Sequence, residues 1–174
     1  GAVKAFLLDS TVNATGDLSL HALGDQDISS TVAAACGAVA IGATGAGGLS
    51  GSIAVANNEI GTDVDASIDG DGTGIRAGSI AVSASDTSTI SALTIAPSLS
   101  AVLGFTTAGV SAVIGAGVAH NTIRGTVAAS VTNAADGLET VLGNIVLTAT
   151  GTPSITALAV APSLSAGGGF IGVA

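Results

Sequence analysis

The feature of this sequence that most constrains its fold is an internal repeat. The segment LTIAPSLSA from Leu93 recurs as LAVAPSLSA from Leu158, at an offset of 65 residues. A second segment, AVANNEIG, matches GVAHNTIR at an offset of 63 and aligns Asn58 with Asn121. Repeats of this kind predict a stack of similar units, each of which buries a face only by packing on its neighbours.

The repeat predicts one domain of roughly two and three-quarter units over the 174 residues. We expect unit boundaries that give residues 1–62, 63–125 and a shortened third unit, 126–174. Because the third unit lacks its last part, it leaves an unpaired apolar edge, and such an edge is a template for another chain.

Within each unit the apolar residues alternate with polar ones. Val64, Ala66 and Ile68 alternate with Asp and Ser, which is the pattern of a half-buried β-strand. The run from Asp69 to Gly74 has the residue types of a turn. The alanine-rich TVAAACGAVA has a competing helical interpretation, but its Gly and Val residues favour a strand. We therefore expect an all-β repeat architecture, a parallel β-solenoid, with a stacked antiparallel β-sandwich as the alternative.

The composition excludes several classes of protein. Apolar residues make up 48% of the chain, aromatic residues 2% and charged residues 9%, with 26 Gly. This apolar content argues against a disordered segment, and the small side chains favour close approach of strands. The net charge of −9, with only Lys4, Arg76 and Arg124 as cations, makes nucleic acid an unsuitable partner.

The long uncharged stretches raise the question of a membrane. Residues 32–56 and 88–119 contain no Asp, Glu, Lys or Arg. Gly, Ser and Thr recur throughout them and Leu is sparse, so we expect no membrane insertion. The sequence begins with Gly and no basic, apolar leader precedes the first strand pattern, so we expect a mature product or an excised piece.

Three short motifs carry a family resemblance. VDASI from Val64, SIAVSAS from Ser79 and AHNTI from Ala119 resemble the beta strand repeat segments of giant bacterial and archaeal adhesin-like surface proteins. The resemblance covers nearly the whole chain. It implies an extracellular, repetitive β-architecture in fibres, adhesins or sheaths at the cell surface, and it supplies no catalytic residues.

An acidic cluster is the one polar feature that indicates a ligand. Asp69, Asp71 and Thr73 alternate before Gly74 and imitate the first half of a calcium loop, but Ile80 stands where that loop needs a bidentate Glu. We expect a solvated turn, with a weak Ca²⁺ site as the alternative, and no other cofactor. Its candidate ligands are Asp63, Asp65, Asp69, Asp71 and Thr73.

Other candidate groups have simpler explanations. His21 and His120 occupy different positions of the repeat, so a catalytic pair is not expected. Cys36 lies among small apolar residues, which predicts a buried, inert thiol. Asn13 begins an Asn-Ala-Thr sequon in an expected turn, a glycosylation acceptor in a secreted protein. We therefore do not expect an enzyme.

The sequence favours a structural role. We expect a subunit or segment of an extracellular β-rich fibre or adhesin, whose partner is itself in a homopolymer or the adjacent repeats of a larger chain. The expected assembly residues lie at the two ends of the sequence and are Gly1, Ala2, Val3, Phe170, Ile171 and Val173. The alternative functions are a β-helical carbohydrate-active protein and an ice-binding protein.

Overall fold

The computed structural model describes residues 1–105 and 109–169. Strands account for 73% of the structure, and the described residues contain no helix. The all-β prediction is confirmed. The predicted assembly residues Phe170, Ile171 and Val173 lie outside the described residues.

The chain winds through three similar circuits, here called rungs. The strands of the first rung are β1 (Ala2–Leu8), β2 (Val12–Asn13), β3 (Leu18–Gly24), β4 (Asp27–Ala33), β5 (Cys36–Gly42) and β6 (Gly47–Gly61). Those of the second are β7 (Asp63–Asp69), β8 (Ile75–Ala77), β9 (Ile80–Asp86), β10 (Thr89–Ile95), β11 (Ser98–Gly104) and β12 (Val110–Arg124). Those of the third are β13 (Val127–Thr132), β14 (Leu138–Thr140), β15 (Ile145–Gly151), β16 (Ser154–Val160) and β17 (Ser163–Gly169).

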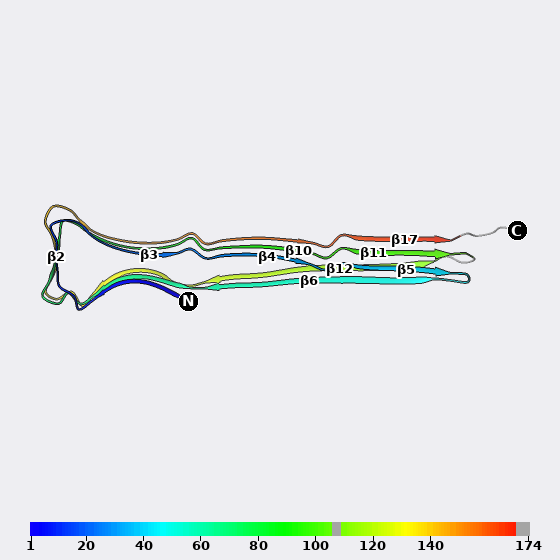
Figure 1. The fold of residues 1–174 in the computed structure, drawn as a ribbon, viewed down its shortest axis with the longest axis horizontal. Helices are drawn as coiled ribbons and strands as arrows, with labels where there is room; N and C mark the ends of the chain where they lie inside the picture. Colours follow the sequence, from blue (N-terminus) through cyan, green and yellow to red (C-terminus); the bar gives the residue numbers. More distant parts are fainter. Residues whose placement is uncertain (106–108, 170–174) are drawn as a thin grey trace. The chain divides into compact units, whose positions relative to one another are not determined.

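Corresponding strands of successive rungs pair side by side, as β4 and β10 do in Figure 1. The sheets have the orders β1-β7-β13, β2-β8-β14, β3-β9-β15, β4-β10-β16 and β5-β11-β17, and β6 pairs with β12. The pairing is parallel, with Val64 opposite Val3 on one side and Val127 on the other. The strands therefore form a parallel, solenoid-like stack, and not the alternative antiparallel sandwich.

The structure divides into two compact units that cut across the rungs. Unit 1 comprises residues 1–28, 59–90 and 122–155, and unit 2 comprises 29–58, 91–121 and 156–174. Each unit therefore contains part of every rung. The rungs and the compact units therefore follow different divisions of the chain.

In unit 1 the core lies between the sheets β1-β7-β13 and β3-β9-β15. Along β7, Val64, Ala66 and Ile68 are fully buried, and the residues between them point outward. Ile80 and Val82 of β9 complete the centre of the same apolar cluster. The period-two pattern thus buries its branched side chains in one interior, as a strand with one covered face requires.

The turn after β7 follows the prediction from its Asp-Gly residues. Gly70 and Gly72 have φ values of 79° and 57°, in the left-handed region that glycine adopts without steric cost. A Cβ atom at Gly70 would also lie 3.2 Å from the backbone atom Asp9 Cα, so the neighbouring rung leaves little room for a side chain there.

In unit 2 the interior is lined by small residues. Ala54, Ala56, Ala92 and Ala96 are buried. The buried hydroxyl residues are Ser50, Ser52, Thr94, Ser98 and Ser100. A Cβ atom at Gly115 would lie 2.6 Å from Ala96 O, because the facing strands approach that closely. The abundance of Ala, Ser and Gly therefore specifies a thin interior between two sheets.

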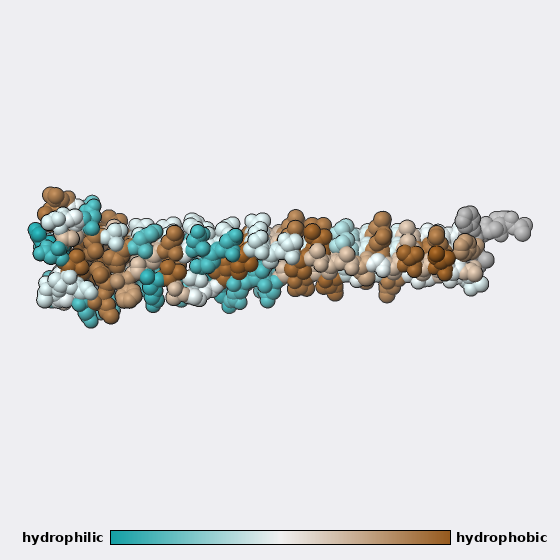
Figure 2. Space-filling model, in the orientation of Figure 1, coloured by the Kyte–Doolittle hydropathy of each residue, from teal (hydrophilic) through white to brown (hydrophobic). Residues whose placement is uncertain are grey.

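The larger aliphatic residues of unit 2 point outward. Along β11, Ser98, Ser100 and Val102 are buried while Leu99 and Leu103 are about half exposed, at 48% and 53%. Most of the unit 2 surface seen in Figure 2 is accordingly brown to white. Apart from Val102, the buried side chains of β11 are thus small and polar, and its leucines point outward.

Candidate functional site

The predicted calcium ligands lie on and after β7, but the structure gives their oxygens other partners. Asp63 Oδ1 accepts hydrogen bonds from the backbone N–H and the hydroxyl of Thr126, each at 2.9 Å. Asp69 Oδ1 accepts from Thr132 Oγ1 at 3.0 Å and from Asn133 Nδ2 at 2.6 Å. These carboxylates therefore tie the second rung to the third.

The remaining predicted ligands also bond to the protein. Asp71 accepts from the backbone N–H of Gly137 in the third rung, and Asp65 accepts from Ser67 Oγ. Thr73 Oγ1 lies 2.9 Å from Thr11 Oγ1 in the first rung. No group of three or more His, Cys, Asp or Glu within residues 1–105 and 109–169 is arranged to hold a metal ion. The structure gives the calcium prediction no support.

Hydrogen bonds from Thr126 change the acidity of Asp63. Its backbone N–H, and then its hydroxyl, favour the ionised carboxylate and lower the pKa of Asp63 below the ordinary value. Desolvation opposes this shift, and the N-terminal amine and Lys4 add to it. Asp63 therefore joins the two rungs best when it is charged.

Polar side chains at matching positions of the first two rungs form further pairs. His21 Nδ1 lies 2.8 Å from Ser83 Oγ, and Thr89 Oγ1 donates to Asp27 Oδ1 at 2.7 Å. The pair of His21 with Ser83 gives this histidine a structural partner. These contacts follow directly from the in-register stack, because residues about 62 positions apart become neighbours.

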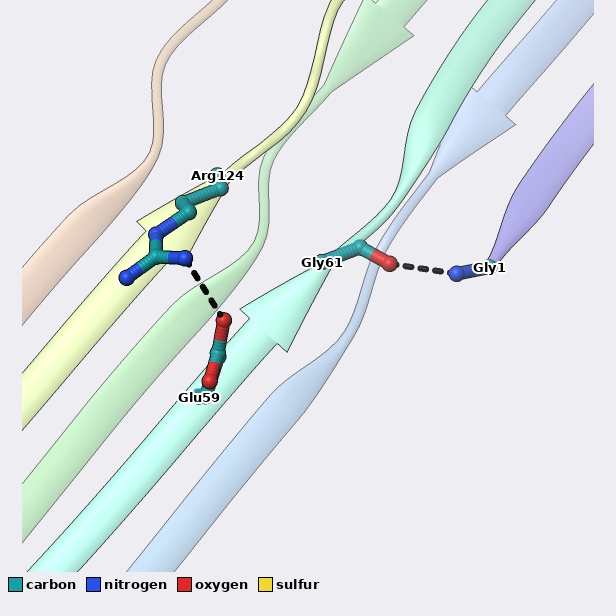
Figure 3. A network of polar contacts seen from close by, with 4 residues as sticks. All are labelled: Gly1, Glu59, Gly61 and Arg124. Carbon is teal, nitrogen blue, oxygen red and sulfur yellow. Dashed lines mark hydrogen bonds and ion pairs between the residues drawn. The ribbon is translucent and has the colours of Figure 1, made fainter.

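Where β6 ends and β7 begins, charged groups meet across the rungs, as Figure 3 shows. Arg124 Nη1 lies 3.4 Å from Glu59 Oε1, and the amine of Gly1 donates to the carbonyl of Gly61. Both partners of the ion pair are largely exposed, so it contributes little to the free energy of folding. The predicted assembly residue Gly1 is thus held at the start of β1, next to Ala2 and Val3.

The first and third rungs present unpaired strand edges. Among the strands of residues 1–105 and 109–169, β1, β3 and β5 have partners only in the second rung, and so do β13, β15 and β17. Cys36 donates its backbone N–H to Pro97 O in the second rung. Since N–H directions alternate along a strand, the N–H groups of Gly37, Val39 and Ile41 point to the open edge.

The thiol of Cys36 is exposed, so the prediction of a buried, inert cysteine is wrong. Cys36 occupies the inward position opposite Ser98, but it lies in the first rung, where no further strand covers it. The nearby Ser50 side chain and the Gly51 backbone lower the pKa of the Cys36 thiol.

Asn13 is exposed but lies in the short strand β2, opposite Arg76 of β8, and not in the turn that its sequon suggested. It lines a hollow of about 410 Å³ together with Arg76, Asp136 and Glu139. Arg76 Nε lies 3.4 Å from Glu139 Oε2. Arg76, the cation that a carbohydrate-active groove would have used, is therefore paired with Glu139.

Comparison with protein-family models, with curated proteins and with solved structures found no match. No helix able to cross a membrane occurs in the part of the chain that the structure describes. The site must therefore be interpreted from its own geometry, and its most distinctive element is the pair of open edges.

Proposed function

We propose that this chain is a structural unit of an extracellular, β-rich fibre or adhesin, in which rungs stack head to tail through their open strand edges. The carrying observation is the pairing of β11 with β5, which places Ser98 opposite Cys36 and Leu99 opposite Gly37. β17 repeats the start of β11 and pairs with it, with Ser163 opposite Ser98 and Leu164 opposite Leu99.

The first four residues of β17 therefore have the same sequence as the part of β11 that already pairs with β5. In the proposed junction, β17 of one copy lies against β5 of the next in the same register, with Ser163 opposite Cys36. Parallel strands in such a register bring the free N–H and C=O groups of both edges together. The same repeat that builds the second rung inside the chain thus supports growth between chains or along a longer chain.

The side chains of unit 1 fit the two alternative functions, ice binding and carbohydrate activity, less well. An ice-binding face needs threonine at one position in every rung. The rows of β3, β9 and β15 instead contain His21, Ser83 and Thr148 in one case and Leu23, Ser85 and Thr150 in the other. A carbohydrate-active protein needs free carboxylates in a groove, whereas Asp63, Asp69 and Asp71 bind the third rung.

The experiment blocks one edge without removing an internal hydrogen bond. Leu18 donates its N–H to Ser79 O, and Gly1 O accepts from Asp63, so by alternation the N–H groups of Ser19 and Phe6 point to the open edge. We expect the double variant Phe6→Pro, Ser19→Pro to keep its circular dichroism spectrum and to form no filaments.

The matched control is Phe6→Ala, Ser19→Ala, which truncates the same exposed side chains and keeps both N–H groups. It should form filaments as the unmodified chain does in electron micrographs. Filaments of equal length from the proline and alanine variants would contradict growth through this edge.

A further inference from the structure

All the formal charge of this chain lies in unit 1. The three basic and twelve acidic residues fall within residues 1–28, 59–90 and 122–155. Unit 2 therefore contains no Asp, Glu, Lys or Arg. A chain surface is normally about one quarter charged, so an uncharged unit with outward aliphatic residues departs strongly from a solvated surface.

One outward surface of unit 2, here called the outer sheet face, is formed by the outward side chains of β5, β11 and β17 and of residues 29–33, 91–95 and 156–160. Its exposed aliphatic residues include Val39, Ile41, Leu99, Leu103, Leu158 and Leu164. Contiguous apolar surface of this kind indicates an interaction site more often than a solvent-facing one.

The outer sheet face has an uneven relief of large and small side chains. The row Gly37, Leu99, Leu164 is followed by the row Val39, Ala101, Ala166 and then by Ile41, Leu103, Gly168. Each row thus contains both larger and smaller residues, and along β11 the small Ala101 lies between Leu99 and Leu103. This relief presents ridges and hollows at the scale of one side chain, which is what interdigitating sheets require.

A groove crosses the same face where β10 and β16 pass into β11 and β17. It has a volume of about 370 Å³ and is lined by Pro97, Pro162, Leu99, Leu164 and Ala35, among others. The groove lies directly beside the ridge of Leu99 and Leu164. A ridge next to a groove on one surface is self-complementary, because a two-fold axis can place each ridge in the other copy's groove.

We infer that the outer sheet face docks against the same face of a second copy of this chain. Three runs of 14 residues, 29–42, 91–104 and 156–169, form the face. At about 3.3 Å per residue and about 4.8 Å per strand, they cover roughly 650 Å² of each copy. The pair would bury roughly 1,300 Å², within the size of a stable interface.

A second copy fits this face better than lipid does. Hydrocarbon gains nothing from the hollows at Gly37, Ala101 and Gly168, and it cannot satisfy the N–H groups at the open edge of β5. Two uncharged faces also meet without repulsion, although each chain carries a net charge of −9. This lateral contact uses the face of the sheet and is independent of head-to-tail stacking through its edges.

The test compares two leucines of equal exposure. Leu99 lies on the outer sheet face and Leu23 points outward in unit 1, and each is 48% exposed. Both are changed to Lys in the Phe6→Pro, Ser19→Pro background, where head-to-tail growth is blocked. Sedimentation velocity then measures the oligomeric state over a range of concentrations.

We expect the edge-blocked protein and its Leu23→Lys variant to be dimers. Leu99→Lys should weaken the dimer by at least about 100-fold, because it buries an unpaired charge. Monomers at all concentrations, equal effects of the two lysines, or flotation of monomers with phosphatidylcholine vesicles would each overturn the inference.

Two further comparisons in the unmodified chain test the lateral contact separately from head-to-tail growth. If the proline background does not fold, the two lysine variants are compared in the unmodified chain, where only Leu99→Lys should remove lateral pairs from electron micrographs. Dimers without filaments in the unmodified chain would contradict the proposed head-to-tail function and leave the lateral contact supported.

Discussion

Asn58 donates its side-chain amide to Asn121 Oδ1 at 2.7 Å, and the two residues occupy the same position of consecutive rungs. The Asn58 amide also donates to Ser30 Oγ at 2.9 Å. Inside unit 2, three polar residues thus form a connected network, which fixes the register in which β6 and β12 lie side by side.

The first prediction concerns this asparagine pair. Asn58→Ala removes both hydrogen bonds and leaves Asn121 Oδ1 without that donor, so the free energy of unfolding should fall by about 1–3 kcal/mol. Asn57→Ala is the matched control, because the Asn57 side chain is exposed on the other side of β6. Equal losses in chemical denaturation of the two variants would contradict a role for the network.

The second prediction contrasts two buried hydroxyls of unit 2. Thr94 is fully buried, and its Oγ1 has no hydrogen-bond partner among the described residues. Thr94→Val keeps the shape and removes the unpaired hydroxyl, so the free energy of unfolding should stay equal or rise by up to about 2 kcal/mol. A loss of stability in Thr94→Val would show that the hydroxyl has a stabilising partner.

Ser98 provides the opposite case, because its Oγ donates to Ile114 O at 2.7 Å and lies 2.8 Å from Ser52 Oγ. Ser98→Ala should lower the free energy of unfolding by about 1–2 kcal/mol. In chemical denaturation, the changes in the free energy of unfolding for Thr94→Val and Ser98→Ala should therefore differ in sign or at least clearly in size.

Much of the fold follows from the sequence, and the reason is its redundancy. The offset that aligns Asn58 with Asn121 is the one at which the two side chains meet. The alternation of Val64, Ala66 and Ile68 likewise predicts their common burial. Each rung repeats the same pattern, so the pairing of strands is specified several times over.

Other properties depend on position in the stack, which a residue's local sequence does not contain. Cys36 has the small apolar neighbours of a buried thiol, yet it is exposed because its rung has no further neighbour. Asp69 and Asp71 look like the start of a calcium loop, yet residues more than 60 positions away bind their oxygens. The surroundings of these candidate site residues therefore depend on the register between rungs, which the local sequence does not show.

The third prediction is that protonation of Asp63 makes the stability of the protein depend on pH. Its folded pKa is lowered, so its contribution to stability is present above the unfolded pKa and is lost as pH falls through the folded pKa. The melting temperature should therefore fall as the pH drops below about 4, the ordinary range of an Asp carboxyl. Asp63→Asn should flatten this part of the curve.

Thr126→Val separates the side-chain donor from the backbone donor to Asp63. It removes the hydroxyl bond but keeps the backbone N–H, which has the larger effect on the carboxyl. We expect a melting curve against pH between those of the unmodified chain and Asp63→Asn. An acid branch that is identical in all three proteins would contradict the role of Asp63.

The fourth prediction concerns the reactivity of Cys36. Its pKa is lowered, so at neutral pH a larger fraction is thiolate than in an ordinary cysteine. Ser50→Ala removes the largest cause of that shift, and the pH profile of alkylation by iodoacetamide should move to higher pH. An unmoved profile would assign the lowered pKa to the backbone of Gly51 and Gly37 instead.

The central claim, that copies continue the stack of rungs through their open edges, is tested most directly by cryo-electron microscopy of the purified protein. We expect filaments in which strands repeat every 4.7–4.9 Å, roughly the spacing of paired strands, without a break at the junction between copies. Only separate monomers at every concentration, with and without Ca²⁺, would contradict this account.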